Sequence, residues 1–214
     1  MNHEVAGLLL AAGASRRLGE PKQLLTDAAG VPAVLRMTHA LRDAGCARVY
    51  VVLGAAAEQV QAALRDESVR CVRHSQWSLG MGSSIAAGVQ AMIGDDLRVH
   101  GVLIAPCDMP AVDAAHLRAL LDRFDGSTRV ASEYGERDGG TIRGIPAILP
   151  RSDWGWLQTL SGESGARPLL RAESVATVVL SRGTHDLDTP ADVERWRAES
   201  RIEAVSLPHS LAPD

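Results

Sequence analysis

One segment near the start of the chain, LLLAAGASRRLGEPKQLL at residues 8–25, holds the residues best suited to binding a polyphosphate. An apolar run ends at Gly13, and three cations follow it: Arg16, Arg17 and Lys22. Glycine lets a ligand approach the backbone, exposed N–H groups bind anionic oxygens, and cations neutralise phosphate charge. The spacing fits neither GxxxxGK[ST] nor GxGxxG. The segment therefore predicts a triphosphate-binding loop of another kind, and the alternative is a solvated basic turn between a strand and a helix.

Carboxylates that could hold a metal ion follow two later apolar runs. Asp108 ends the segment VLIAPCD, and Asp186 and Asp188 lie in the segment DLDTPAD. Mg²⁺ usually takes one or two carboxylates and keeps several waters, so an acidic side chain at a strand end can hold it against substrate phosphates. The alternative is a structural role, because an Asp before a helix often caps it and Asp188 stands two residues before Pro190.

Two further loops carry groups that could contact a nucleotide. Residues 77–84, WSLGMGSS, open a helix whose free N–H groups and hydroxyls could reach a base or a ribose, and the candidates there are Gly82, Ser83 and Ser84. Residues 161–170, SGESGARPLL, place Arg167 after a glycine turn, where it could reach a phosphate. Taken alone, both loops favour the plainer alternative, an ordinary serine cap and a surface arginine.

Short apolar runs alternate with helical segments along most of the chain, and this alternation must position the candidate residues. The expected strands are Val5–Ala12, Val49–Leu53, Val69–Val72, Val102–Ala105 and Val175–Leu180. The expected helices are Val31–Ala44, Ala56–Arg65, Ser83–Ile93, Ala114–Phe124 and Pro190–Arg197. Continuous apolar runs suit a sheet covered on both faces, so the pattern predicts an α/β fold with a mainly parallel sheet between two helical layers. Ligands of such sheets bind beyond the carboxyl ends of the strands.

The stretch from Ser127 to Pro150 departs from this alternation. Arg129–Ser132 and Gly144–Leu149 look like strands, and the glycine-rich, charged segment Gly135–Gly144 between them predicts a loop or hairpin tip near the site. After residue 198 the chain alternates polar with apolar residues and contains two prolines. We therefore expect one domain over residues 1–198 and a poorly ordered or peripheral tail over residues 199–214.

The composition excludes several classes of function. A net charge of −4 lacks the basic excess that most nucleic-acid binders need. The apolar run Val5–Ala12 is too short to span a bilayer, so no membrane partner is expected. The three cysteines form no CxxC pair, which argues against a disulfide framework and favours the reducing cytoplasm. The histidines show no HxxxH or HxH spacing, so a histidine metal site has little support.

Six segments together resemble the MobA-like nucleotidyltransferases, and within that family they look most like the molybdenum cofactor cytidylyltransferases. They occur in the family's order and cover the chain up to about Trp196: LLLAAGASRRLGEPKQLL, GMGSSIAAGV, PCDMP, RGIPAILPR, LSGESGARPLL and DLDTPADVERW. The resemblance implies a Rossmann-like, three-layer α/β/α fold that binds an NTP at the first loop. It also implies that the terminal phosphate of a molybdopterin-type acceptor attacks the α-phosphorus of CTP and releases pyrophosphate.

The resemblance also implies roles for individual residues. By the resemblance, the catalytic residues of this chain would be Lys22, Arg16 and Asp108. Its nucleotide contacts are Leu10, Ala11, Ala12, Gly13, Arg17, Gly82, Ser83, Ser84 and Arg167, with the base beside Ala11, Ala12 and Gly13. Asp108 would carry Mg²⁺ together with a second carboxylate, for which Asp186 is preferred to Asp188. Gly144 and Pro146 would shape the acceptor side.

The choice of nucleotide and acceptor is less constrained than the chemistry. This chain reads LAAG at residues 10–13, where the guanylyltransferase branch of the family typically reads LAGG, and this favours CTP over GTP. Other transferases remain as alternatives, using GTP or acting on a sugar or polyol phosphate. A third alternative is a non-catalytic carrier that delivers molybdenum cofactor to a dehydrogenase. The presence of both Lys22 and Asp108 favours an enzyme over a carrier.

Overall fold

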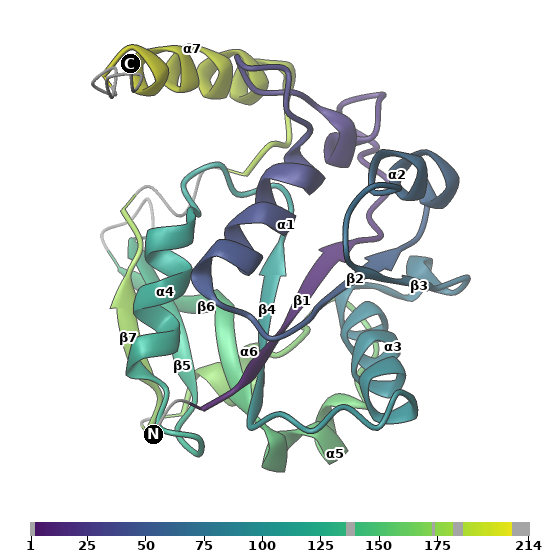
Figure 1. The fold of residues 1–214 in the computed structure, drawn as a ribbon, viewed down its shortest axis with the longest axis vertical. Helices are drawn as coiled ribbons and strands as arrows, with labels where there is room; N and C mark the ends of the chain where they lie inside the picture. The colour runs from purple at the N-terminus through teal and green to yellow at the C-terminus, as the bar shows by residue number, and fades with distance from the viewer. Residues whose placement is uncertain (1–2, 136–139, 173, 182–185, 207–214) are drawn as a thin grey trace, which may run out of the picture.

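The computed structural model describes residues 3–135, 140–172, 174–181 and 186–206 of the chain (Figure 1). Seven strands form one sheet in the order β3-β2-β1-β4-β6-β5-β7. In chain order the strands are β1 (Val5–Ala11), β2 (Val49–Leu53), β3 (Arg70–Arg73), β4 (Gly101–Pro106), β5 (Val130–Gly135), β6 (Thr141–Pro150) and β7 (Ala176–Val179). Each strand expected from the sequence is therefore present, with ends displaced by a few residues.

Most neighbouring strands run parallel, and the predicted mainly parallel sheet is confirmed. β1 pairs in parallel with β2 and β4, β2 with β3, and β5 with β7. β6 is the exception, because it runs antiparallel to both β4 and β5. The carboxyl ends of β1, β2 and β4 therefore meet at one edge of the sheet, where a ligand site is expected.

The loop expected at Gly135–Gly144 is shorter than the sequence indicated. β5 continues to Gly135 and β6 begins at Thr141, and these two residues face each other in the antiparallel ladder. Tyr134 and Ile142 form the next pair, so apolar and aromatic side chains extend the ladder into the segment that reads as glycine-rich and charged. Residues 136–139, at the centre of the expected loop, lie outside the described residues.

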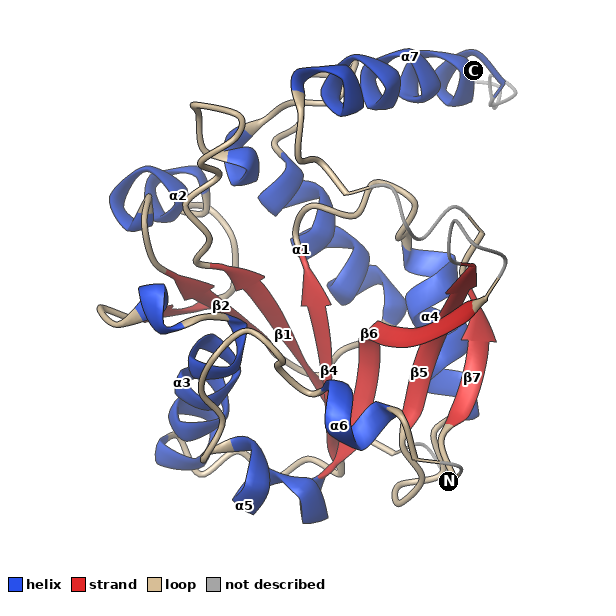
Figure 2. Cartoon of the chain, turned by 180° about the vertical axis from the view of Figure 1, so that it is seen from behind, coloured by secondary structure: helices blue, strands red, loops and turns tan. Residues whose placement is uncertain are grey.

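Two helical layers cover the sheet (Figures 1 and 2). On one face, a core cluster joins the sheet to α1 (Ala33–Ala44), α2 (Ala57–Ala63) and α4 (Ala114–Arg123). On the other face, a second cluster joins it to α3 (Met81–Gly94), α5 (Trp154–Leu157) and α6 (Arg167–Leu170). In β1, Leu9 belongs to the first cluster and Leu8 to the second. Because both faces are buried, the strand reads as a continuous apolar run.

The last helix, α7 (Pro190–Ser206), lies across the carboxyl edge of the sheet (Figure 1). Val193 and Trp196 pack against Leu25 and Leu187 in a small separate cluster. The helix was expected to end at Arg197 but continues to Ser206, past the point where a tail was predicted to begin. Residues 207–214 are not described. No helix in the described ranges is both long and apolar enough to cross a bilayer.

Candidate active site

The loop after β1 is fixed by hydrogen bonds to its own residues. The side-chain amide of Gln23, which is fully buried, donates to the carbonyl of Ala11 at 3.1 Å and to that of Gly13 at 2.8 Å. The Ser15 hydroxyl accepts from the backbone N–H of Lys22 at 2.9 Å, and Ser15 has a positive φ of 51°. These internal hydrogen bonds define the shape of the loop, and a loop held in one shape loses less entropy when it binds a ligand.

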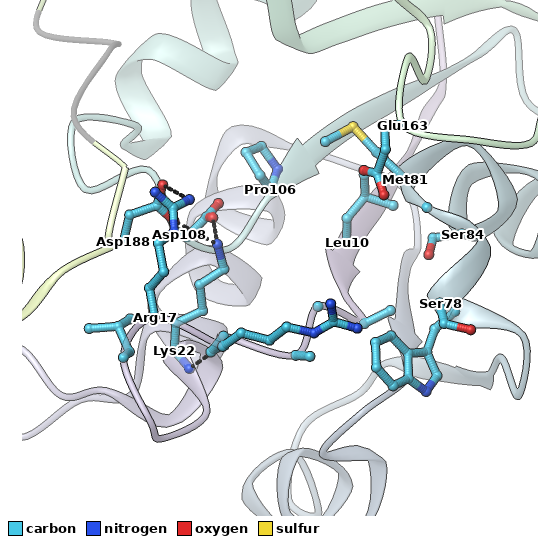
Figure 3. A pocket seen from close by; sticks show the side chains of 18 residues that line it. Leu10, Arg17, Lys22, Ser78, Met81, Ser84, Pro106, Asp108, Glu163 and Asp188 are labelled. Atoms are coloured by element: carbon cyan, nitrogen blue, oxygen red, sulfur yellow. Dashed lines mark hydrogen bonds and ion pairs between the residues drawn. The ribbon is translucent and has the colours of Figure 1, made fainter.

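A cavity of about 530 Å³ lies beyond the carboxyl ends of β1 and β4 (Figure 3). Its size is typical of a small-molecule site. Its lining comes from the first loop, the start of α3, the end of β4 and two late segments: Leu10, Ala12, Gly13, Ala14, Ser15, Arg16, Arg17, Leu18, Lys22, Trp77, Ser78, Gly80, Met81, Ser84, Pro106, Asp108, Glu163 and Asp188. Five stretches that are far apart in the sequence thus form one wall.

Ion pairs join the cations of the first loop to the carboxylates of the strand ends. The Lys22 ammonium contacts Asp108 in a hydrogen-bonded pair and lies 3.6 Å from Asp188. The Arg17 guanidinium donates to Asp188 at 2.7 Å. Burial alone would lower the pKa of Lys22, but the Asp108 carboxylate outweighs burial and the pKa is raised. Lys22 therefore carries its positive charge at any physiological pH.

A third acidic side chain, Asp186, lies close enough to the carboxylates of Asp108 and Asp188 for their charges to act on it. Although Asp186 keeps contact with solvent, desolvation by the surrounding protein and the negative charges of Asp108 and Asp188 raise its pKa to about 6. The backbone N–H of Leu187, between the two carboxylates, donates to the Asp108 carbonyl at 2.9 Å. This bond ties the 186–188 segment to the end of β4.

The acidic group fits a hard divalent cation. Desolvation and then the charges of Asp108 and Asp188 raise the pKa of Asp186, and a bound cation would offset both effects because it stabilises the ionised carboxylate. Within the described ranges, no three Asp, Glu, His or Cys side chains form a complete ligand cluster. Mg²⁺ needs no such cluster, because it completes its octahedron with water and substrate phosphates.

Arg36, on α1, fixes the backbone that follows Asp108. Its guanidinium donates to the carbonyl of Val112 at 2.7 Å and to that of Met109 at 3.0 Å. The next turn is closed by Asp113, which accepts from the N–H of His116 at 2.7 Å and caps α4. The carboxylate of Asp108 is therefore presented from a turn that is held at several points.

The start of α3 is packed tightly against residues 161–163. A Cβ on Gly80 would lie 2.5 Å from the backbone of Gly162, and a Cβ on Gly82 would lie 2.7 Å from the carbonyl of Ser161. The N–H of Gly82 donates to Gly162 at 2.8 Å, and the N–H of Gly162 donates to Leu79 at 2.9 Å. The glycines of GMGSS therefore serve packing between two chain segments.

The two serines of α3 have different environments. Ser83 is buried and donates to the carbonyl of Gly80 at 2.8 Å, while its oxygen lies 2.9 Å from the ring nitrogen of His74. Ser84 lines the cavity. Ser83 thus stabilises the helix start, and Ser84 is the serine placed to contact a ligand.

The structure brings most of the predicted site residues together. Those that line the cavity are Leu10, Ala12, Gly13, Arg16, Arg17, Lys22, Ser84, Asp108 and Asp188. Those that do not line it are Ala11, Gly82, Ser83, Arg167 and Asp186. Ala11 is buried in β1, and Arg167 is exposed on α6. Asp186 lines a separate, smaller hollow with Pro110 and Trp196.

Several lining residues were not singled out in the sequence: Trp77, Ser78, Met81 and Glu163. Trp77 packs on Gly54, where a Cβ would lie 2.7 Å from the Trp77 ring. In the segment WSLGMGSS the glycines and serines indicated a ligand contact, and the aromatic and thioether side chains beside them line the cavity as well. Arg36 left no local signal, because its partners Met109 and Val112 lie in a distant segment. Glu163 lies in the segment SGESGARPLL, where the sequence indicated Arg167 instead.

The cysteine next to Asp108 is not a nucleophile in this geometry. Cys107 is buried, and burial raises the pKa of its thiol strongly, followed by the effect of the Asp108 charge. A thiol reacts as thiolate, so this residue is inert at neutral pH. The groups that the cavity does offer, two arginines, a lysine and carboxylates, suit a transfer that depends on positioning and charge neutralisation.

Comparison with known proteins agrees with this geometry. The family model described as the MobA-like NTP transferase domain matches residues 7–178. A relative named nicotine blue oxidoreductase, from Paenarthrobacter nicotinovorans, is 34% identical over 173 residues, which cover 78% of this chain and 81% of the relative. A probable molybdenum cofactor guanylyltransferase from Rhodopirellula baltica is 27% identical over 191 residues, which cover 87% of this chain and 89% of that protein.

Solved structures show the same architecture. A nucleotidyl transferase from Methanothermobacter superposes with a TM-score of 0.77 at 26% identity, covering 94% of this chain and 99% of that one. The manganese complex of Rv0371c from Mycobacterium tuberculosis H37Rv superposes with a TM-score of 0.70 at 26% identity, covering 91% and 98% of the two chains. With the family model spanning most of the chain and the cation-rich loop facing the strand-end carboxylates, this protein belongs to the MobA-like NTP transferase family.

Proposed function

We propose that this protein transfers CMP from CTP to the terminal phosphate of a molybdopterin-type acceptor, with Mg²⁺, and releases pyrophosphate. The observation that carries the proposal is the pairing of Lys22, from the first loop, with Asp108, from the end of β4, on the wall of the cavity. A polyphosphate bound by the loop is thereby brought to the carboxylate that would hold a metal ion.

In this proposal the acceptor phosphate oxygen forms a bond to the α-phosphorus, and the bond from that phosphorus to the β-phosphate oxygen breaks. Lys22, Arg16 and Arg17 would contact the triphosphate and neutralise the charge that develops on the leaving pyrophosphate. Asp108 would hold Mg²⁺ with Asp186 or Asp188, and the ion when bound supplies Lewis acidity and orients phosphate oxygens. Lys22 and Arg17 exchange their carboxylate partners for phosphate as the substrate enters.

The preference for CTP rests on the first loop. Ala12 lines the cavity at the position where the guanylyltransferase branch typically has glycine, and we expect its methyl group to narrow the space for a base. A pyrimidine fits a narrower space than a purine does. GTP is the alternative nucleotide, because one relative is named a probable molybdenum cofactor guanylyltransferase.

The test is pyrophosphate release from CTP, GTP, ATP and UTP, with Mg²⁺ or Mn²⁺, in the presence and absence of molybdopterin cofactor. Release that requires both CTP and the pterin supports the proposal, and release with GTP alone contradicts the choice of base. Measurable nucleotide binding without release under any condition would support the alternative of a cofactor carrier for a molybdenum dehydrogenase.

A second candidate follows from the relative named nicotine blue oxidoreductase. Its identity of 34% over most of both chains makes an oxidoreductase worth a direct assay. The protein would be incubated with nicotine blue and NADH or NADPH, and loss of the dye's absorbance would be followed. Turnover of the dye without any pyrophosphate release would replace the transferase proposal.

A further inference from the structure

We propose that Glu163 selects the nucleobase by accepting a hydrogen bond from an amino group on the base, so that the cavity takes cytosine in preference to uracil. The inference rests on the proposed function in one respect, namely that an NTP occupies this cavity. It adds a specificity residue from the loop SGESGARPLL, where the sequence indicated only Arg167.

The cavity has two chemically different ends (Figure 3). Arg17, Lys22, Asp108 and Asp188 gather at one end, and Glu163 lies at the other beside Met81 (Figure 3). The cations attract the triphosphate to their own end, as in other phosphate sites. The nucleoside must then extend toward the end that holds Glu163.

The distal end has walls that suit a flat heterocycle. Leu10 and Met81 supply apolar surface there, and Ser78 and Ser84 supply short polar groups (Figure 3). Trp77, the neighbour of Ser78 in the chain, also lines the cavity and adds an aromatic ring. Pockets for small organic groups are built in this way, from apolar walls with a few polar groups that fix orientation. Glu163 adds a carboxylate at this end (Figure 3).

The backbone that carries Glu163 is fixed in place. The neighbouring Gly162 exchanges hydrogen bonds with Leu79 and Gly82, at 2.9 and 2.8 Å. A Cβ on Gly80 would lie 2.9 Å from the backbone nitrogen of Glu163, so the two chain segments are in direct contact. The carboxylate therefore extends from a rigid platform on the start of α3.

The Glu163 carboxylate is also available to a ligand. Throughout the described part of the chain, no Lys, Arg or His nitrogen pairs with it, whereas Asp108 and Asp188 at the other end are both paired with cations. Glu163 is exposed to the cavity and to solvent. Since an ionised carboxylate can only accept hydrogen bonds, it requires a donor on the ligand.

The donor requirement separates the two pyrimidines. Cytosine carries an amino group on C4, and uracil carries a carbonyl oxygen at the same position. A carboxylate facing the amino group gains a charge-assisted hydrogen bond, and the same carboxylate facing a carbonyl leaves two acceptors opposed. Sites that depend on such a polar contact discriminate more strongly than apolar pockets do.

The experiment compares the full-length wild type with Glu163→Gln, because glutamine keeps the shape and can donate to a carbonyl. Binding of CTP and UTP is measured by calorimetry with Mg²⁺, and pyrophosphate release is measured with the acceptor. We expect the wild type to prefer CTP and the Glu163→Gln variant to lose at least tenfold of the CTP over UTP ratio. The maximal rate with saturating CTP should change less than threefold. Glu194→Gln, on the exposed surface of α7, is the matched control and should leave the ratio unchanged.

Three outcomes would overturn the inference. If Glu163→Gln binds CTP and UTP in the wild-type ratio, the carboxylate does not read the base. If the variant raises only the KM of the pterin acceptor, the carboxylate faces the acceptor. If the wild type binds no NTP, the proposed function fails as well. This outcome is seen in the wild type alone, whereas the other two appear only in the comparison with Glu163→Gln.

Discussion

The backbone N–H of Leu187 donates to the carbonyl oxygen of Asp108 at 2.9 Å, and this bond joins the two acidic segments of the site. Leu187 is buried, so its side chain anchors the segment while Asp186 and Asp188 on either side extend away. The carboxylates are thereby held beside Asp108 by main-chain geometry. Substitutions at these carboxylates should consequently change chemistry more than they change the fold.

Replacing Asp108 with asparagine should abolish most of the activity. The amide keeps the size of the side chain but loses the charge that would hold the metal ion and pair with Lys22. We expect pyrophosphate release to fall by about 10²–10³-fold, in the range found when one electrostatic catalytic group is removed. Stopped pyrophosphate assays measure this directly, and Asp96→Asn, at an exposed surface pair with Arg98, is the control. Unchanged turnover would remove Asp108 from the mechanism.

Replacing Lys22 with methionine should lower the rate of pyrophosphate release more than it lowers the stability of the fold. The side chain is 19% exposed, and methionine fills similar space without the ammonium group. We expect kcat to fall by about 10²-fold because the leaving pyrophosphate loses a fixed positive charge. Arg98→Met, which removes a cation from the exposed surface, should retain full activity. A Lys22→Met enzyme with normal kcat and only a raised KM would place the lysine in ground-state binding instead.

The raised pKa of Asp186 predicts opposite pH effects on stability and on metal binding. The folded protein keeps this proton up to about pH 6, whereas the unfolded chain releases it near 3.8. In the metal-free protein this contribution to stability is present at low pH and is lost as the pH rises through about 6. The melting temperature of the metal-free wild type should therefore fall between pH 5 and pH 7 because of this group. The melting temperature of Asp186→Asn, which has no such proton, should fall less over the same range.

A metal ion reverses the dependence because it binds the deprotonated carboxylate. If Asp186 is a ligand, the affinity for Mn²⁺ at pH 5 should be about tenfold lower than at pH 7, which is the factor for displacing one proton from a group of pKa about 6. Calorimetric titration at the two pH values gives the ratio. Equal ratios in wild type and Asp186→Asn would assign the metal to Asp108 and Asp188 alone.

Arg36 should affect both stability and rate, because it holds the turn behind Asp108. Arg36→Met removes two hydrogen bonds to backbone carbonyls, of 2.7 and 3.0 Å, and we expect a loss of about 1.5–3 kcal/mol in unfolding free energy. Arg118→Met is the matched control, since Arg118 donates to the carbonyl of Asp43 at 2.9 Å at the far end of α1. Both variants should lose stability in urea, and only Arg36→Met should lower kcat. Equal kcat in the two variants would limit Arg36 to a structural role.

Gly54 and Gly94 form a contrasting pair of glycines. A Cβ at Gly54 would lie 2.4 Å from the carbonyl of Ala12 and 2.7 Å from the ring of Trp77, so Gly54→Ala must push the first loop or the tryptophan into the cavity. We expect a loss of about 1–3 kcal/mol in stability and weaker CTP binding. Gly94, on α3, has open space, so Gly94→Ala should stabilise the protein by up to about 1 kcal/mol and leave binding unchanged. Weak binding by both variants would contradict this account of the cavity.

The sequence predicted the parts of the fold whose signals are local. β1, β2 and β4 are buried on both faces and read as continuous apolar runs, so they were found with small errors. The direction of β6 could not be predicted, because an apolar run has the same composition in either orientation. The short helices at 151–157 and 167–170 fall below the length at which helical periodicity can be recognised.

The same distinction applies to the site. The cations of the first loop and Asp108 could be identified because glycine, charge and strand ends occur together within a few residues. Arg36 donates to carbonyls far away in the chain, and nothing beside it in the sequence marks those contacts. Glu163 lies in a segment that the sequence did indicate, but Arg167 was the residue there whose charge suits a phosphate. Ser83 was an ambiguous case, because its type suits both a ligand contact and a helix start, and its bonds to Gly80 and His74 satisfy it within the protein.

The pairing of Lys22 with Asp108 and of Arg17 with Asp188 makes the site electrically self-compensated when no ligand is bound. A nucleotide that arrived alone would take both cations and leave two carboxylates facing phosphate oxygens of the same sign. A divalent ion that arrived alone would instead leave the two cations without counter-charges. If the proposed function is correct, the complex of nucleotide and metal brings one partner for each half of both pairs. We therefore expect the site to bind the nucleotide and the metal ion more tightly together than it binds either alone.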